Sequence, residues 1–452
     1  MPHVYVIMAA LILIAYLITW LAPQGSFERV EGPRGTQLVA PGTFQYLEGD
    51  RLGFLDLLFS IPRGLVEAGP IIFGGLMIGG LFAMLQHTGL LALMIQKVVN
   101  AFSRRPILIV PVMMIPMTLF TTFTGAMELG LVYVPVMIPL MLRMGYDRFT
   151  ATAMVLVSTC AGFSVALTAP ATVGLAQTLM ELPLYSGIGY RSLILAFISL
   201  TGMLYVMRYA MKVQSNPQSS LVHDDGQNGA FLTSEDNVPS FSTWRNVVGG
   251  LFLAAGMGVM IHGLLNHGWY FIEIGGWYAF MAIVLGLVYG FTFSRIAEIF
   301  HEGFNLVLVG VIVIGLARAA SILLNDGNVL DTIVHGISQL IDGTPSYLTA
   351  VGMFIVQGLF NFLVGSGSGQ ALITMPIMSG LSDLLDVTRQ TAVLAFQFGD
   401  GFTNIIFPGV ALAILAIGKI PYGRWLKFIA PLMLVWCTSA AIFLVIAQHT
   451  GW

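Results

Sequence analysis

The segment 346–385 reads SYLTAVGMFIVQGLFNFLVGSGSGQALITMPIMSGLSDLL and decides the fold. It holds two helix-length apolar halves that are joined by small residues, Gly365 to Gln370, without the charges of a water-exposed turn. Irregular backbone at membrane depth is tolerated only inside protein or against a water-filled cavity. The segment therefore predicts a re-entrant hairpin, which is a pair of half-helices that enters the membrane and turns back inside it.

A second segment of the same kind covers residues 106–142. Its elbow is the stretch TTFTGA at 121–126, which again separates two apolar halves and carries no charge. One such hairpin lies in each half of the chain. This placement predicts a duplicated architecture.

The composition indicates that the rest of the chain also lies in a membrane. Of 452 residues, 57% are hydrophobic and only 9% are charged, whereas soluble proteins carry about 25% charged residues. Runs of about 20 apolar residues are long enough to cross the hydrocarbon layer as helices. The predicted crossings are 4–21, 70–92, 150–180, 190–207, 246–262, 272–293, 303–323, 390–417 and 428–447. We therefore predict an all-α polytopic membrane protein with about nine transmembrane helices plus the two hairpins.

The basic residues give an orientation for this map. With the N-terminus in the cytoplasm, twelve of the 19 Lys and Arg residues fall on cytoplasmic loops, as the positive-inside rule requires. The C-terminus then lies outside. Residues 22–56 form an external loop, and the polar stretch 213–245 forms a cytoplasmic linker that divides the chain.

The two halves resemble each other in sequence. The stretch GFSVALTAP at 162–170 has a counterpart in GFTNIIFP at 401–408, and each follows a hairpin with a Met- and Pro-rich second arm. We predict a first repeat at 1–212, a connecting helix and loop at 246–271, and a second repeat at 272–452. The repeats are inverted on this map because the hairpins enter from opposite sides. Inverted repeats that contain broken helices are typical of secondary transporters with a site at the midplane.

The second elbow is a candidate anion site. A turn of small residues leaves backbone N–H groups free, and the positive end of the following half-helix attracts carboxylates. The hydroxyl groups of two serines can bind an anion or ligate a cation. A tight crossing of small-residue helices is the structural alternative. The candidate residues here are Ser366, Gly367, Ser368 and Gly369.

The first elbow adds Thr124, Gly125 and an acid, Glu128, that follows it inside an apolar run. An intramembrane carboxylate is expensive and indicates function. Glu128 can bind a substrate ammonium group, bind a coupling cation or carry a proton. It can also serve only as a dipole-stabilised acid at a helix start.

The stretch Asp400-Gly-Phe-Thr403-Asn404 lies within a predicted crossing, and Pro408 interrupts the helix after it. Freed carbonyl groups together with Thr403 and Asn404 can hold a cation or the polar end of a substrate, and Asp400 can couple a cation or proton. A kink that serves packing is the alternative. The equivalent stretch of the first half offers Ser164 but no acid.

Arg318 lies in the crossing 303–323, where it can pair with a substrate carboxylate or with Asp326, or extend to the interface. The sequence contains no zinc-helix motif, because His301-Glu302 is not followed by the second histidine that such a motif requires. Cys160 and Cys437 both lie in apolar stretches and predict no disulfide or metal site. We therefore expect no metal, no cofactor and no enzymatic activity.

The sequence resembles the C4-dicarboxylate anaerobic carrier family in its YfcC-type branch, which is associated with basic amino-acid antiport. The resemblance covers nearly the whole chain and is most specific in SGSGQ at 366–370 and in RQTAVLAFQFGDGFTN at 389–404. It implies kinship with the ion-transporter superfamily, a scaffold domain, a moving transport domain and a homodimer. Related carriers hold carboxylates and sodium with Ser, Asn and Thr at the hairpin tips. This chain has a Gly-Ser-Gly-Ser-Gly tip instead.

These observations predict a secondary active transporter in the inner membrane that moves a small carboxylate-bearing metabolite by elevator-like alternating access. An amino acid suits both features, because the intramembrane acids favour its amine and the Ser/Gly tip favours its carboxylate. Its transport is expected to be antiport or to be coupled to a sodium ion or a proton. The alternative is a C4-dicarboxylate or short-chain carboxylate carrier that is coupled to sodium or protons. A membrane enzyme acting on lipid and a channel are further alternatives. A net charge of −3 indicates no nucleic-acid partner.

Overall fold

The computed structural model describes residues 4–452 apart from 32–36, 41, 224–242, 268 and 342–344. The helices of the first half are α1 (Val4–Leu21), α2 (Phe54–Glu67), α3 (Gly69–His87), α4 (Leu90–Phe102), α5 (Ile109–Thr124), α6 (Gly130–Arg143), α7 (Arg148–Ser164), α8 (Leu175–Leu179) and α9 (Ile188–Ser215). Those that follow are α10 (Thr243–His267), α11 (Phe271–Val288), α12 (Phe293–Asp326), α13 (Leu330–Ile341), α14 (Ser346–Val364), α15 (Gly367–Leu384), α16 (Arg389–Thr403), α17 (Val410–Ile417) and α18 (Tyr422–Thr450). The all-α membrane class is confirmed.

Nine helices in the described part of the chain are long and apolar enough to cross a membrane. Seven of them coincide with predicted crossings, and the other two are α14 and the first arm of the earlier hairpin, residues 106–124. The predicted crossings 150–180 and 390–417 are each interrupted, so neither contains a single helix of spanning length. The total of nine is therefore the same, but its membership differs from the prediction.

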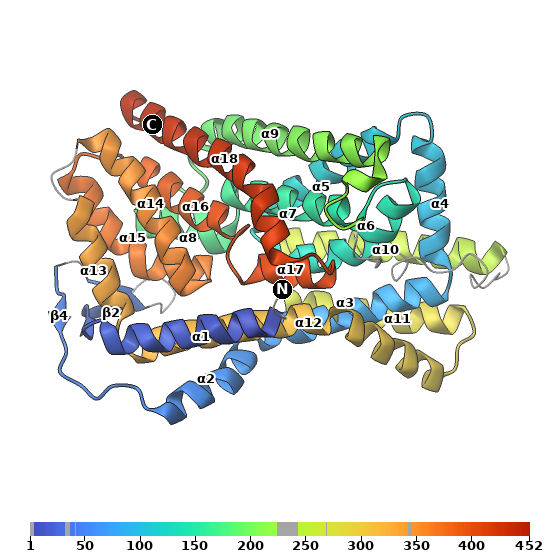
Figure 1. The fold of residues 1–452 in the computed structure, drawn as a ribbon, viewed down its shortest axis with the longest axis horizontal. Coiled ribbons are helices and arrows are strands. Elements are labelled where there is room, and N and C mark those ends of the chain that lie inside the picture. Colours follow the sequence, from blue (N-terminus) through green and yellow to red (C-terminus); the bar gives the residue numbers. More distant parts are fainter. Residues whose placement is uncertain (1–3, 32–36, 41, 224–242, 268, 342–344) are drawn as a thin grey trace.

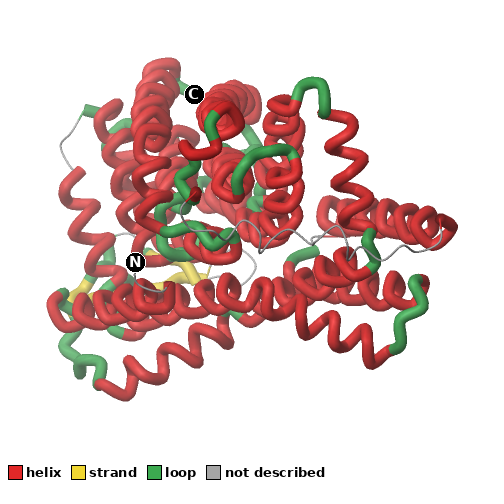
Figure 2. The backbone as a smooth tube through the Cα atoms, turned by 45° about the vertical axis from the view of Figure 1, so that its right-hand side comes forward, coloured by secondary structure: helices red, strands yellow, loops and turns green. Residues whose placement is uncertain are grey.

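The helices form two layers. Figure 1 shows α1, α2, α3, α11 and α12 along one side of the molecule, with the bundle of α5 to α9 and α14 to α18 above them. Figure 2 shows the same separation after rotation. At opposite ends of Figure 1, α4 and α13 run from the lower layer to the bundle, and α12 packs against α17 between the layers.

Glycines bring the helices of the lower layer into close contact. A Cβ atom built on Gly79 of α3 would lie 2.4 Å from the carbonyl oxygen of Gly303 in α12. A Cβ atom on Gly74 would lie equally close, at 2.4 Å, to the carbonyl oxygen of Phe271 at the start of α11. Small residues permit such close backbone approach, and the van der Waals packing that results is one of the forces that drive helix association in membranes. The lower layer is thus tightly packed around α3.

Two interrupted helices form the centre of the bundle. α7 ends at Ser164, and helical structure resumes with a π-helical turn at Pro170–Gly174 that leads into α8. α16 ends at Thr403, and α17 begins at Val410, so the expected interruption is present. The two helices cross closely, because a Cβ atom on Gly401 would lie 2.3 Å from the Cα atom of Ser164.

Several elements were not predicted from the sequence. The run 70–92 divides into α3 and α4, since Gly89 adopts a φ of 72° and turns the chain between them. The described residues of the stretch 22–56, which is predicted to lie outside, contain four short strands, β1 (Gly25–Ser26), β2 (Arg29–Glu31), β3 (Gln37–Val39) and β4 (Gln45–Tyr46), with β1 paired to β4 and β2 to β3. Arg29 ties this region to Asp331 of α13 through an ion pair of 2.9 Å. The predicted linker begins later than expected, because α9 extends to Ser215, and most of it lies outside the described residues.

Candidate functional site

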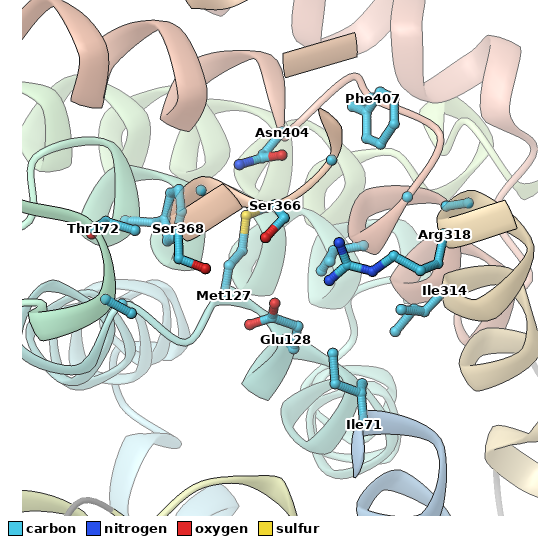
Figure 3. A pocket seen from close by; sticks show the side chains of 18 of the residues that line it. Ile71, Met127, Glu128, Thr172, Ile314, Arg318, Ser366, Ser368, Asn404 and Phe407 are labelled. Carbon is cyan, nitrogen blue, oxygen red and sulfur yellow. The ribbon is translucent and has the colours of Figure 1, made fainter. Parts of the chain in front are cut away.

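The two elbows, the interruption after α16 and helix α12 meet around one cavity of about 320 Å³. Figure 3 shows side chains from these elements converging on it, with Glu128 facing Ser366 and Arg318. A cavity of this size suits a small metabolite. The cavity is lined by Glu67, Pro70, Ile71, Gly125, Met127, Glu128, Phe163, Ala171, Thr172, Tyr270, Ile314, Ala317, Arg318, Ser321, Gly365, Ser366, Gly367, Ser368, Asn404, Phe407, Gly409 and Val410.

The second elbow is shorter than the sequence suggested. Only Gly365 and Ser366 lie outside the helices, because α15 already begins at Gly367. Gly365 adopts a φ of 25°, and the Ser366 hydroxyl accepts a bond of 3.3 Å from the Gly369 N–H group as an N-cap. Ser366 and Ser368 therefore face the cavity at the positive end of α15, which attracts anions.

The first elbow is likewise narrower than predicted, because α5 continues through Thr124 and the turn is made by Gly125 with a φ of 71°. The Thr124 hydroxyl accepts a bond from the N–H group of Ala126. Thr122 fastens this elbow to the interruption after α7, since its hydroxyl donates to the carbonyl of Val165 at 2.9 Å. The turn is thereby held against the broken helix.

Glu128 stands at the centre of the charged groups of the cavity. It lies in the short 3₁₀ turn Met127–Leu129 that precedes α6, and none of the described residues gives its buried Oε2 atom a hydrogen bond. A buried polar atom without a partner costs about 1–3 kcal/mol, more when charged. This carboxylate oxygen is therefore available to a cationic or hydrogen-bonding ligand.

Arg318 pairs with Glu67 across the cavity, with Nε 3.5 Å from Oε1. Of the three alternatives for Arg318, the pairing with Asp326 does not occur, because Asp326 lies two turns further along α12 and bonds Arg63 of α2 instead. Glu67 belongs to the end of α2, a helix that the sequence reading did not identify. The cavity thus presents two carboxylates and one guanidinium group.

Asp400 lies directly behind the second elbow and is fully buried. Its Oδ1 atom accepts a bond of 3.3 Å from Asn404, while Oδ2 has no partner. A Cβ atom on Gly367 would lie 2.5 Å from this Oδ2 atom, so only glycine allows the elbow to approach so closely. The carboxylate and the tip of α15 are in direct contact.

A buried amide, Asn361 of α14, organises the interruption after α16. Its Nδ2 atom donates to the Asp400 carbonyl at 3.0 Å, to the Thr403 hydroxyl at 2.8 Å and to Asn404 Oδ1 at 3.0 Å. Its own Oδ1 atom is buried without a partner, as is Oδ2 of Asp400. Two free acceptor oxygens thus accompany the broken helix, and such oxygens suit a hard cation or a proton.

Some of the predicted site residues line the cavity and others do not. Those that line it are Gly125, Glu128, Arg318, Ser366, Gly367, Ser368 and Asn404. Thr124, Ser164, Gly369, Thr403 and Asp400 lie behind its wall. Ser164 in particular is buried and bonds the Cys160 carbonyl at 2.7 Å. Their proposed roles remain predictions.

The sequence reading missed three contributors, Glu67, Thr172 and Asn361. Thr172 lines the cavity, and its hydroxyl oxygen is buried without a partner. A usable signal existed for Asn361, because an amide within a helix of spanning length is expensive in a membrane. No group of three or more His, Cys, Asp or Glu side chains that could hold a metal occurs among the residues that the structure describes.

Membrane-spanning helices whose interruptions and elbows converge on one polar cavity are the arrangement of a secondary transporter. The family model for the C4-dicarboxylate anaerobic carriers matches residues 1–449, and the chain belongs to this family. It is thus a multi-pass membrane protein and a secondary transporter.

Two relatives match over almost their full lengths. One is YfcC of Escherichia coli (strain K12), which carries the provisional name of a basic amino acid antiporter and is 30% identical over 100% of this chain and 97% of its own. The other is an uncharacterised protein of Haemophilus influenzae, which is 25% identical over 98% of this chain and 96% of its own.

Two solved transporter structures are also similar. MtrF of Neisseria gonorrhoeae, described within a class of antimetabolite efflux pumps, matches with a TM-score of 0.44 and 17% identity over 99% of this chain and 96% of its own. The YdaH transporter of Alcanivorax borkumensis matches with a TM-score of 0.43 and 15% identity over 100% of this chain and 99% of its own.

Proposed function

We propose that this transporter carries an amino acid, most suitably one with a cationic side chain, by alternating access between two inverted repeats. The observation that carries the proposal is the Glu128 carboxylate, which lines the cavity and whose buried Oε2 atom has no partner among the described residues. Glu67 already has Arg318 as its partner, so Glu128 leaves an excess of negative charge. A substrate ammonium or guanidinium group would neutralise it.

The other end of an amino acid would bind at the second elbow. Ser366 and Ser368 offer hydroxyl groups beside the positive end of α15, and Arg318 lies across the same cavity. A guanidinium group binds carboxylates in a forked geometry. The provisional name of the relative YfcC, a basic amino acid antiporter, agrees with this assignment.

The order of helices supports the inverted repeats, 1–212 and 272–452, that are joined through 213–245 and 246–271. Elements of the two halves correspond in sequence order: α1 with α11, α2–α3 with α12, α4 with α13, α5–α6 with α14–α15, α7–α8 with α16–α17, and α9 with α18. On this proposal α5–α6 and α14–α15 are the re-entrant hairpins. The lower layer is the scaffold, the bundle is the moving domain, and α4 and α13 are the arms between them.

Asp400 and Asn361 would bind the coupling ion, a sodium ion or a proton. Both have a buried acceptor oxygen without a partner, and Asp400 touches the elbow that would hold the substrate. Binding of the coupling ion at Asp400 and Asn361 would therefore affect the position of the Ser366–Ser368 turn. We further propose a homodimer in the inner membrane, with the N-terminus in the cytoplasm and the C-terminus outside.

A second candidate is a C4-dicarboxylate carrier. The family description favours it, and Arg318 with the second elbow would suit two carboxylates if Glu128 were protonated. Competition separates the two candidates. Succinate should fail to displace labelled L-arginine if the amino-acid proposal holds, and should displace it if the site is made for dicarboxylates.

The deciding experiment is uptake of labelled L-arginine into proteoliposomes, with or without L-arginine inside. Glu128→Gln should lower the apparent affinity about 10- to 150-fold, because a hydrogen bond to a charged group is worth about 1.5–3 kcal/mol. Glu31→Gln, on the exposed strand β2, is the matched control and should leave uptake unchanged. Equal uptake by wild type and Glu128→Gln would refute the assigned role.

A further inference from the structure

At each of the two helix interruptions, a carbonyl group accepts a hydrogen bond from a side chain of a later helix, but the two side chains are of different chemical types. Ala166 stands four residues after Gly162, as Ile405 stands four residues after Gly401. The Ala166 carbonyl accepts a bond of 3.5 Å from Nη1 of Arg191, and the Ile405 carbonyl accepts one of 2.8 Å from Nε1 of Trp425.

The two donors are themselves equivalent in position. Arg191 is the fourth residue of α9 and Trp425 is the fourth residue of α18, the last helix of each half. Both side chains are fully buried. A charged group thus stands in the first half where a neutral indole stands in the second.

Arg191 has little else to bind. Its Nε and Nη2 atoms are buried without partners, and the described residues give it no carboxylate within ion-pair distance. The ring of Trp452 lies 5.9 Å from its guanidinium carbon, a cation–π contact. A buried charge without a counter-ion is expensive, so packing alone does not explain an arginine here.

The backbone supplies the missing negative potential. α7 ends at Ser164, and the C-terminal end of a helix carries roughly half a negative elementary charge, which favours cations. α16 ends in the same way at Thr403, but there Asp400 adds a carboxylate and Trp425 adds no charge. The first interruption is compensated by a fixed charge, whereas the described residues provide no fixed cation at the second.

We propose that the Arg191 guanidinium group is the built-in cation of the first interruption and positions residues 165–169 through its charge. The corresponding place in the second half, beside Asp400, is left for an exchangeable cation. This comparison rests on the proposed ion coupling, but the role of Arg191 itself does not. Ligands of the guanidinium class should therefore replace the side chain when it is removed.

The test is thermal stability of the purified protein with three substitutions. Arg191→Lys keeps the charge and should stay close to wild type. Arg191→Met keeps the bulk without the charge and should melt several degrees lower. Arg191→Ala should gain about 1–2 °C from methylguanidinium at roughly tenfold excess over its dissociation constant, but nothing from methylurea, the neutral molecule of the same shape.

Two results would overturn the proposal. Arg191→Met could melt at or above the wild-type temperature, as expected if a buried charge were merely replaced by a better-packed side chain. Alternatively, methylurea could stabilise Arg191→Ala as well as methylguanidinium does, which would assign only packing or hydrogen bonding to the side chain. If Arg191→Ala does not accumulate, the comparison of Lys with Met decides alone.

The readout separates this proposal from the proposed function, because it needs no transported substrate. The rescue is repeated in a Glu128→Gln background, which removes the group proposed to bind a substrate cation. Stabilisation that persists there supports Arg191 even if no amino acid is transported. Loss of the rescue in that background would place methylguanidinium in the cavity and overturn the proposal.

Discussion

Replacing Gly367 by alanine tests the contact between the second elbow and Asp400. A Cβ atom at this position would lie 2.5 Å from Asp400 Oδ2 and 2.9 Å from Cγ2 of Thr172. Ordinary contacts begin near 3.4 Å, so the elbow or the carboxylate must move by about 1 Å, a displacement able to impair a pre-organised site. Gly367 is the first residue of α15, where alanine by itself would favour the helix. Any loss must therefore come from the displaced elbow.

The size of the effect follows from the cost of overpacking, about 1–3 kcal/mol. If this cost falls on the substrate-bound state, the apparent affinity decreases about 5- to 150-fold, since 1.4 kcal/mol is a factor of ten. Part of the overpacking cost will also destabilise the protein without substrate. The melting temperature should then decrease together with the affinity.

The assay is labelled L-arginine uptake over a range of concentrations, with the melting temperature measured on the same preparations. Gly369→Ala is the matched control, because its Cβ atom would meet only side chains and no closer than 3.3 Å, with Ser366 Oγ at 3.3 Å and Val364 Cγ1 at 3.6 Å. Gly258→Ala in α10 has nothing within 4 Å and should be neutral or slightly stabilising. If Gly367→Ala transports as well as Gly369→Ala, the close contact with Asp400 does not hold the elbow.

Three further predictions concern other regions. Asp400→Asn should abolish any rise in melting temperature caused by sodium, and a retained response in a sodium titration at fixed pH would exclude Asp400 as the sodium-coupling group. Gly79→Ala should destabilise the lower layer by about 1–3 kcal/mol through a backbone clash, measured by thermal unfolding against Gly276→Ala, which has open space. Hydrogen bonds and charge from Arg389 hold the pKa of the Asp383 carboxyl below its usual range. Its stabilising effect is therefore present at neutral pH and lost as the pH falls below about 4, so the melting temperatures of wild type and Arg389→Gln should converge in acid.

The sequence located the elbows because their physical signal is local. Small residues such as Gly365 and Ser366 between apolar half-helices require a protected turn whatever surrounds them. The interruption after Thr403 was equally readable, since Gly401 and Pro408 both weaken a helix. These signals were sufficient to predict the turns and the interruption, which line part of the cavity.

Other features depend on neighbours that a sequence does not reveal. The pairing of Arg318 with Glu67 requires α2 to end beside the middle of α12, and no local pattern fixes that position. The predicted elbows were too long, because small residues such as Gly367 also start a helix when a serine caps it. Asn361 was overlooked because its role comes from three atoms on another helix.

On the proposed duplication, the ends of α7 and α16 are two similar negative helix ends, and a carrier has a physical reason to treat them differently. If both ends needed an exchangeable cation, the empty carrier would hold two uncompensated negative sites in a low-dielectric interior. If both had a fixed cation, no ion could be released and none could drive transport. A permanent guanidinium group at one end, Arg191, and at the other a carboxylate, Asp400, whose Oδ2 atom has no partner among the described residues, would limit the uncompensated charge to the single place where an ion can enter and leave. On the proposals above, the two repeats therefore differ at Arg191 and at Asp400, and this difference allows a duplicated fold to couple transport to an ion.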